Sequence, residues 1–141
     1  MQILYFQDLA AKDDALVHCR EMRDVPQLQV QSCAFSGVGL KHFAEAKNLK
    51  RLFIEDAPIA DAGLASIAML TNLELLDTSC VETPTKITVA GLRRLQGLVK
   101  LKEVYITMPN ASQEIENELR QMLPHCKRIH LKAWSEEQVD R

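Results

Sequence analysis

The sequence predicts an α/β protein built from a strand-helix unit that repeats along the chain. Apolar residues recur at offsets of 3, 6, 9, 12 and 14 in four successive stretches of the 141 residues. Within each stretch the apolar spacing changes from three, as on one stripe of a helix, to two, as in a strand with one buried face. A hydrophobic content of 47% with 26% charged residues is ordinary for a globular chain of this length.

The clearest repeat starts at Leu40 and ends at Ile54. Its apolar positions are Leu40, Phe43, Ala46, Leu49, Leu52 and Ile54. The same offsets lead from Leu16 to Val30, from Leu64 to Thr78 and from Leu92 to Ile106, and a fifth repeat with a shorter helix runs from Leu119 to Leu131. Repeats starting near 16, 40, 64, 92 and 119 are 24, 24, 28 and 27 residues apart. Ten residues separate Val30 from Leu40 and Ile54 from Leu64, and stepping back ten from Leu16 reaches Phe6, which places an opening strand at Leu4–Phe6.

Two helix starts show a hydroxyl residue after an apolar residue, with a leucine four positions further on. These are Phe35-Ser36 with Leu40, and Ile87-Thr88 with Leu92. The pattern is typical of an N-cap with a hydrophobic staple. In the intervening unit Ala60 is a poor cap, and we expect Asp61 to take its place.

A unit of about 25 residues cannot bury both of its faces alone, so the units are expected to stack. The strands then form a parallel sheet on the concave face of a solenoid, and the wider helices lie on the convex face. We predict one domain of five such repeats plus the opening strand, residues 1–134, followed by a polar tail, 135–141.

These residues resemble the leucine-rich-repeat family, in its cysteine-containing or short bacterial form with a ribonuclease-inhibitor-like horseshoe. The pattern L-x-x-L-x-L-x-x-C/N-x-L is similar to Val25–Phe35, with Cys33 at the Cys/Asn position, and to Leu49–Ile59. Ile59–Leu64 resembles the family's I-T-D-x-G-L helix entry, and Leu123–Lys127 resembles its closing repeats. The third and fourth repeats depart from the pattern, because they carry about four extra residues after the strand.

The resemblance implies that the concave sheet face binds a partner. Two rows of outward-facing side chains are expected to cross it, one side chain from each strand. The first row is Tyr5, Gln29, Phe53, Asp77, Tyr105 and His130, and the second is Ile3, Gln27, Arg51, Leu75, Glu103 and Arg128. An apolar centre with a charged rim is typical of protein-interaction hot spots. We predict that a protein partner contacts Tyr5, Arg51, Phe53, Leu75, Asp77, Glu103, Tyr105 and His130. The alternative is that these are the scattered exposed apolar residues of any surface.

The longer connections at 79–86 and 107–113 follow consecutive strands and should emerge at the same sheet edge. Insertions on one side of a repeat protein often form part of its binding face, and tolerated surface decoration is the alternative.

The four cysteines are expected to be free thiols in a reducing, cytoplasmic setting. Cys19, Cys33 and Cys126 fall on core positions, whereas Cys80 is expected to be exposed in a loop. No C-x-x-C pair is present, and Cys126 and His130 should face opposite sides of the sheet, so no metal site is predicted.

The leading prediction is a non-enzymatic protein-interaction module without a cofactor. A net charge of -2 argues against nucleic-acid binding, and no run of about 18 apolar residues or signal peptide is found. Asp77 and His130 should lie two strands apart, about 10 Å, too far to act as a base and its orienting group. The second candidate is an assembly subunit or homo-oligomer that pairs through the Leu4–Phe6 strand, because bare sheet edges are rarely left open.

Overall fold

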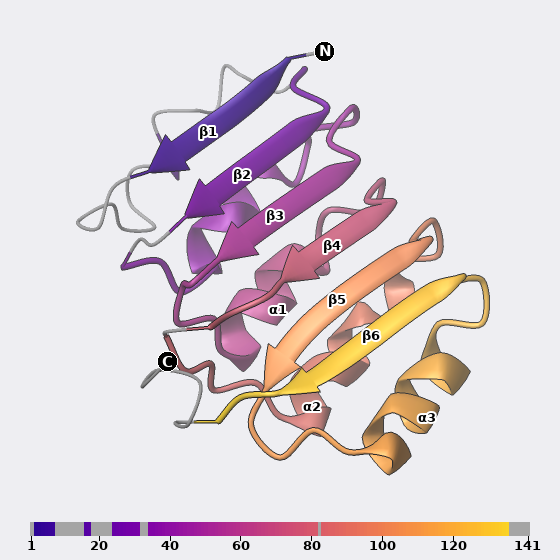
Figure 1. Ribbon diagram of the computed structural model, residues 1–141. Coiled ribbons are helices and arrows are strands. Elements are labelled where there is room, and N and C mark those ends of the chain that lie inside the picture. Colours follow the sequence, from indigo (N-terminus) through magenta and orange to yellow (C-terminus); the bar gives the residue numbers. More distant parts are fainter. Residues whose placement is uncertain (1, 8–15, 18–23, 32–33, 82, 136–141) are drawn as a thin grey trace.

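A computed structural model of the chain describes residues 2–7, 16–17, 24–31, 34–81 and 83–135. The described part has the predicted α/β class. Its strands form a single parallel sheet in the order β1-β2-β3-β4-β5-β6, so each strand pairs with the next one along the chain. The helical segments between strands lie against one face of this sheet, and no described helix covers the other face (Figure 1).

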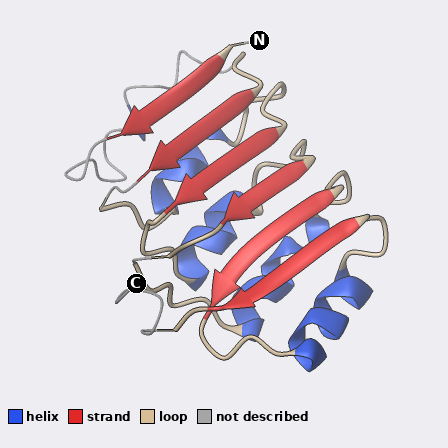
Figure 2. Cartoon of the chain, in the orientation of Figure 1, coloured by secondary structure: helices blue, strands red, loops and turns tan. Residues whose placement is uncertain are grey.

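The strands are β1 (Ile3–Gln7), β2 (Gln27–Gln31), β3 (Arg51–Glu55), β4 (Leu75–Thr78), β5 (Glu103–Met108) and β6 (Arg128–Ala133). The helical segments are the 3-10 helices η2 (Val38–Phe43) and η3 (Arg94–Gly97) and the α-helices α1 (Asp61–Ile67), α2 (Val89–Arg93) and α3 (Gln113–Met122). Figure 2 shows the strands in front and the helical layer behind them.

The strand predictions are confirmed, and so is their register. Leu28 pairs with Leu52, Leu52 with Leu76, and Leu76 with Val104, so equivalent positions of successive units lie side by side. All four side chains are fully buried between the sheet and the helices. The apolar spacing of two is therefore confirmed as that of a strand with one buried face: alternate residues point into the core and the others point to the uncovered face.

The helix predictions are confirmed less evenly. The segment after Ser36 forms the 3-10 helix η2, in which the N–H groups of Leu40 and Ala44 donate to carbonyls three residues earlier. Most of the helix expected after Leu16 lies outside the described residues, and Leu16 itself is buried. The tail from residue 136 also lies outside them.

The expected N-cap position is confirmed at Thr88 and wrong at Ser36 and Asp61. Gly37 precedes η2 in place of Ser36. Thr88 does occupy the N-cap position of α2, but its hydroxyl makes no capping hydrogen bond. That hydroxyl instead donates to the carboxylate of Asp61, which also accepts the Thr88 N–H at 2.8 Å. Asp61 thus ties the start of α1 to the start of α2, rather than capping its own helix as expected.

The helix entries of neighbouring units approach each other closely at glycine positions. A Cβ at Gly63 would lie 2.1 Å from the carbonyl oxygen of Ser36, and a Cβ at Gly91 would lie 2.0 Å from the carboxylate of Asp61. Neither separation is possible between real atoms. At Gly63 the backbone of the preceding unit must shift, whereas at Gly91 the Asp61 side chain must move. Gly97, in contrast, has open space around its Cα.

We expect Gly63→Ala to destabilise the fold by about 1–3 kcal/mol, because the new methyl group collides with backbone of the preceding unit. Gly97→Ala is the matched control, and it should leave the free energy of unfolding within about 1 kcal/mol of the parent. Urea unfolding of the three proteins measures both effects. Equal midpoints for the parent and Gly63→Ala would contradict the close approach.

One buried hydroxyl lacks a hydrogen-bond partner among the described groups. Thr78 is fully buried at the end of β4, in the register position of Ile106, and its Oγ1 is unpaired. Thr85 is also buried, but its hydroxyl donates to the carbonyl oxygen of Thr107 at 2.9 Å. The two threonines therefore share burial and differ in whether the hydroxyl is satisfied.

We predict opposite effects for valine at these two positions. Thr78→Val removes an unsatisfied polar group and should stabilise the fold by about 1 kcal/mol, whereas Thr85→Val removes a made hydrogen bond and should destabilise it by about 1–2 kcal/mol. Thermal or urea denaturation gives the sign of each change. Destabilisation by Thr78→Val would mean that its hydroxyl has a partner.

Candidate binding surface

The uncovered face of the sheet carries both predicted rows of side chains. The pairing register aligns Tyr5, Gln29, Phe53, Asp77, Tyr105 and His130 as one row. It aligns Ile3, Gln27, Arg51, Leu75, Glu103 and Arg128 as the other. We call these twelve positions the open face. All eight residues predicted to contact a partner belong to it.

A small depression lies on the open face where β3, β4 and β5 begin. It has a volume of about 330 Å³ and is lined by Arg51, Phe53, Leu75 and Glu103, all predicted binding residues, and by Glu74 and Lys102. Sequence reasoning missed the last two, because each immediately precedes a strand and so falls outside the alternating positions. Their proximity to the row follows only from the path of the chain into the strand.

Charges around this depression are paired with one another. Lys102 Nζ lies 2.6 Å from Glu74 Oε1, and Lys50 Nζ lies 3.9 Å from Glu74 Oε2. The hydrogen bond from Lys102 lowers the pKa of the Glu74 carboxyl, and burial opposes this effect. Because both lysine side chains are well exposed, these ion pairs add little to the free energy of unfolding.

The two rows also make contacts at β5 and β6. The rings of Tyr105 and His130 have centroids 6.4 Å apart and planes tilted by 49°. A carboxylate oxygen of Glu103 accepts a hydrogen bond from Arg128 at 3.2 Å and lies 3.5 Å from the donating Tyr105 hydroxyl. Four residues of the open face are therefore held relative to one another by their own polar and ring contacts.

The remaining predicted residues are more separate. Tyr5 lies on β1, at the end of its row, and its hydroxyl donates to Gln31. Asp77 Oδ1 accepts a hydrogen bond from the N–H of Ser79 at 2.9 Å, so this carboxylate oxygen is bonded to the backbone just after β4. Tyr105 lies between Asp77 and His130 in the row, as the sequence predicts. Gln27 was expected on the exposed row, but its side chain is buried, with 8% of its surface exposed.

The connection after β4 is fastened to its neighbours rather than projecting from them. The N–H of Val81 donates to Asp56 at 2.7 Å, and the N–H of Cys80 donates to the Thr107 hydroxyl at 3.2 Å. Further along, the N–H of Lys86 donates to Ile59 at 2.9 Å. The strands are parallel, so their carboxyl ends lie along one side of the sheet. The connections after β4 and β5 both begin on that side, as predicted (Figure 1).

The prediction that Cys80 is exposed is wrong. Its side chain is 1% exposed, and its Sγ lies 3.5 Å from the carbonyl oxygen of Ala57. Burial raises the pKa of the Cys80 thiol to about 11. The reason is the folding back of the connection onto Ala57 and Thr107, which local sequence does not specify. Cys126, predicted as a core residue, is half-buried, and Cys19 and Cys33 lie outside the described residues.

We expect Cys80 to resist alkylation in the native protein. With a pKa of about 11, only about one thiol in a thousand is ionised at pH 8, and the sulfur is covered. Iodoacetamide labelling followed by peptide mapping should show Cys80 modified slowly in buffer and rapidly in denaturant. Rapid native labelling of the Cys80 peptide would contradict its burial.

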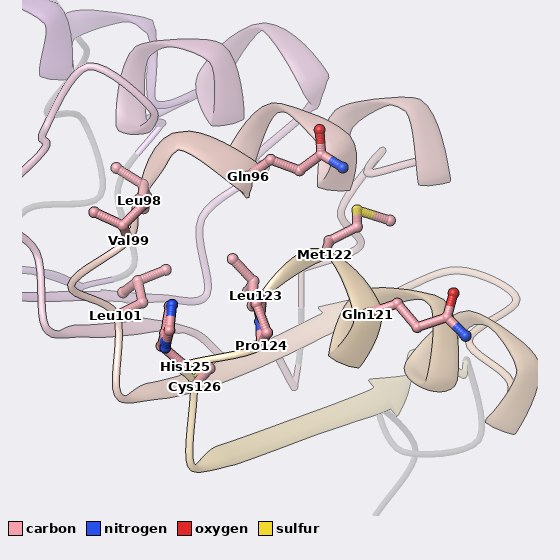
Figure 3. A pocket seen from close by; sticks show the side chains of 10 residues that line it. All are labelled: Gln96, Leu98, Val99, Leu101, Gln121, Met122, Leu123, Pro124, His125 and Cys126. Atoms are coloured by element: carbon pink, nitrogen blue, oxygen red, sulfur yellow. The ribbon is translucent and has the colours of Figure 1, made fainter.

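A second hollow lies away from the open face, between the turn after η3 and the connection from α3 to β6. Its volume is about 310 Å³, and its walls come from residues 96–101 and 121–126. Figure 3 shows apolar side chains such as Val99 and Met122 there, beside the amides of Gln96 and Gln121. None of the predicted binding residues lines it.

Comparison of the sequence with protein-family models and with curated proteins found no match. Among the described residues, no group of three or more His, Cys, Asp or Glu side chains is arranged to hold a metal ion. No described helix is both long enough and apolar enough to span a membrane.

Proposed function

We propose that this chain is a leucine-rich-repeat-type solenoid that binds another protein through its open face, without a cofactor and without catalysing a reaction. The repeat offsets and the in-register parallel sheet support the solenoid. The depression bounded by Phe53, Leu75 and the charged side chains around them carries the binding proposal. Apolar side chains beside charged ones can accept a protruding apolar side chain of a partner and leave the polar groups to set specificity.

The arrangement of charges supports a protein partner over a small apolar ligand. The depression is shallow, and its lining combines two basic and two acidic side chains: Arg51, Lys102, Glu74 and Glu103. Such a surface suits a large, mixed-charge contact area rather than an enclosing pocket. We include the connections after β4 and β5 in the proposed interface, because they begin at the strand ends and because the first is held by hydrogen bonds to neighbouring units.

We expect Phe53→Ala with Tyr105→Ala to remove partner binding while the fold is retained. Both side chains are partly exposed on the uncovered face, so their truncation leaves the aliphatic core intact. Loss of two aromatic anchors should weaken affinity at least tenfold, which corresponds to a loss of about 1.4 kcal/mol or more in binding free energy. The measurement is quantitative affinity capture from an extract of the cells that produce the protein.

The matched control is Met69→Ala with Val99→Ala, which truncates two exposed apolar side chains outside the sheet. Proteins captured by the parent and by this control, but lost with the aromatic double variant, are the expected partners. Capture of the same proteins in the same amounts by a folded double variant would overturn the proposal.

A further inference from the structure

The two edges of the sheet differ in charge. β6 presents Arg128 and Lys132 at exposed positions along its length. β1 contains no charged residue and no proline, and its sequence is Ile-Leu-Tyr-Phe-Gln. Ile3 and Tyr5 are 48% and 44% exposed on its outward side. Charged side chains on an edge strand discourage another strand from pairing with it. β6 has this protection, and β1 lacks it.

The outer edge of β1 has no strand partner among the described residues, whereas its inner edge pairs with β2. Leu4 and Phe6, which point toward the helical layer, pack against the core but are only partly buried. An added strand would therefore meet backbone groups that no described strand engages and two apolar side chains that are still partly exposed.

We propose that two copies of this chain pair through β1, antiparallel, about a two-fold axis at Tyr5. In this register Tyr5 lies opposite Tyr5 of the second copy, Leu4 opposite Phe6, and Ile3 opposite Gln7. Residues directly opposite in an antiparallel pair point to the same face of the sheet. The Leu4 and Phe6 contacts join the two cores, and the Tyr5 contact joins the two open faces.

Pairing of β1 with β1 of a second copy fits this edge better than pairing of β1 with β6, which would give head-to-tail growth. Addition of β1 to β6 of another molecule would use the edge that Arg128 and Lys132 protect, and it would continue without closing. The β1 pair closes as a dimer, because the same five residues serve both chains. It would form about four to six backbone hydrogen bonds across a small area, so the dimer is weak and concentration-dependent. This association does not rest on the proposed binding role of the open face.

The test is the molar mass of the full chain in solution, by light scattering from about 10 µM to about 1 mM. The parent should shift from monomer to dimer across this range. Ile3→Lys with Gln7→Lys should stay monomeric, because like charges then face each other at two positions, and Ile3→Glu with Gln7→Glu should behave in the same way. An equimolar mixture of these two variants should again form dimers, since each pair of opposed charges is now attractive.

The matched control is Met69→Lys with Val99→Lys, which adds the same charge at exposed sites outside the edge strands and should dimerise like the parent. Circular dichroism checks that each variant is folded; Ile3 and Gln7 are both exposed, so their replacement leaves the core in place. A monomeric parent at the highest concentration overturns the proposal. Dimers that survive both charge variants, or a mixture that stays monomeric, overturn it as well.

Discussion

The structure depends on the register between neighbouring strands. Rows of aliphatic side chains, such as Leu28, Leu52, Leu76 and Val104, continue from strand to strand and are completely covered by the helical layer. A shift of any strand by one residue would turn its apolar side chains outward and its polar ones into the core. Burial of these rows therefore fixes the backbone hydrogen bonds of the sheet, and with them the positions of all outward-facing side chains.

The open face is a consequence of the same constraint. Because the buried row is in register, Phe53, Asp77 and Tyr105 must also lie side by side, although 24 and 28 residues separate them in sequence. The sheet thus holds these outward-facing residues at fixed positions, and they can vary without affecting the core. Ion pairs such as that between Glu103 and Arg128 then hold these side chains near one another, although exposed ion pairs contribute little to the free energy of unfolding.

Contacts between helix entries and connections complete the stack. Gly63 allows the backbones of adjacent units to approach within a distance that no side chain permits, and Gly91 leaves room for Asp61, which links one helix entry to the next through Thr88. Cys80 fills the space beneath the connection after β4. These contacts each join residues more than 20 positions apart, so they hold units together rather than stabilising any single helix.

The sequence by itself determined the strands, their order and their register, because each of these follows from a local period that repeats with nearly constant spacing. It also placed all eight predicted binding residues in two rows, since residues at equivalent positions of stacked units must align. Tertiary structure alone decided the burial of Cys80, the interaction of Asp61 with Thr88 and the contribution of Glu74 to the depression. The physical reason is that these depend on where a connection folds back and how closely two units approach, and both are set by contacts between units.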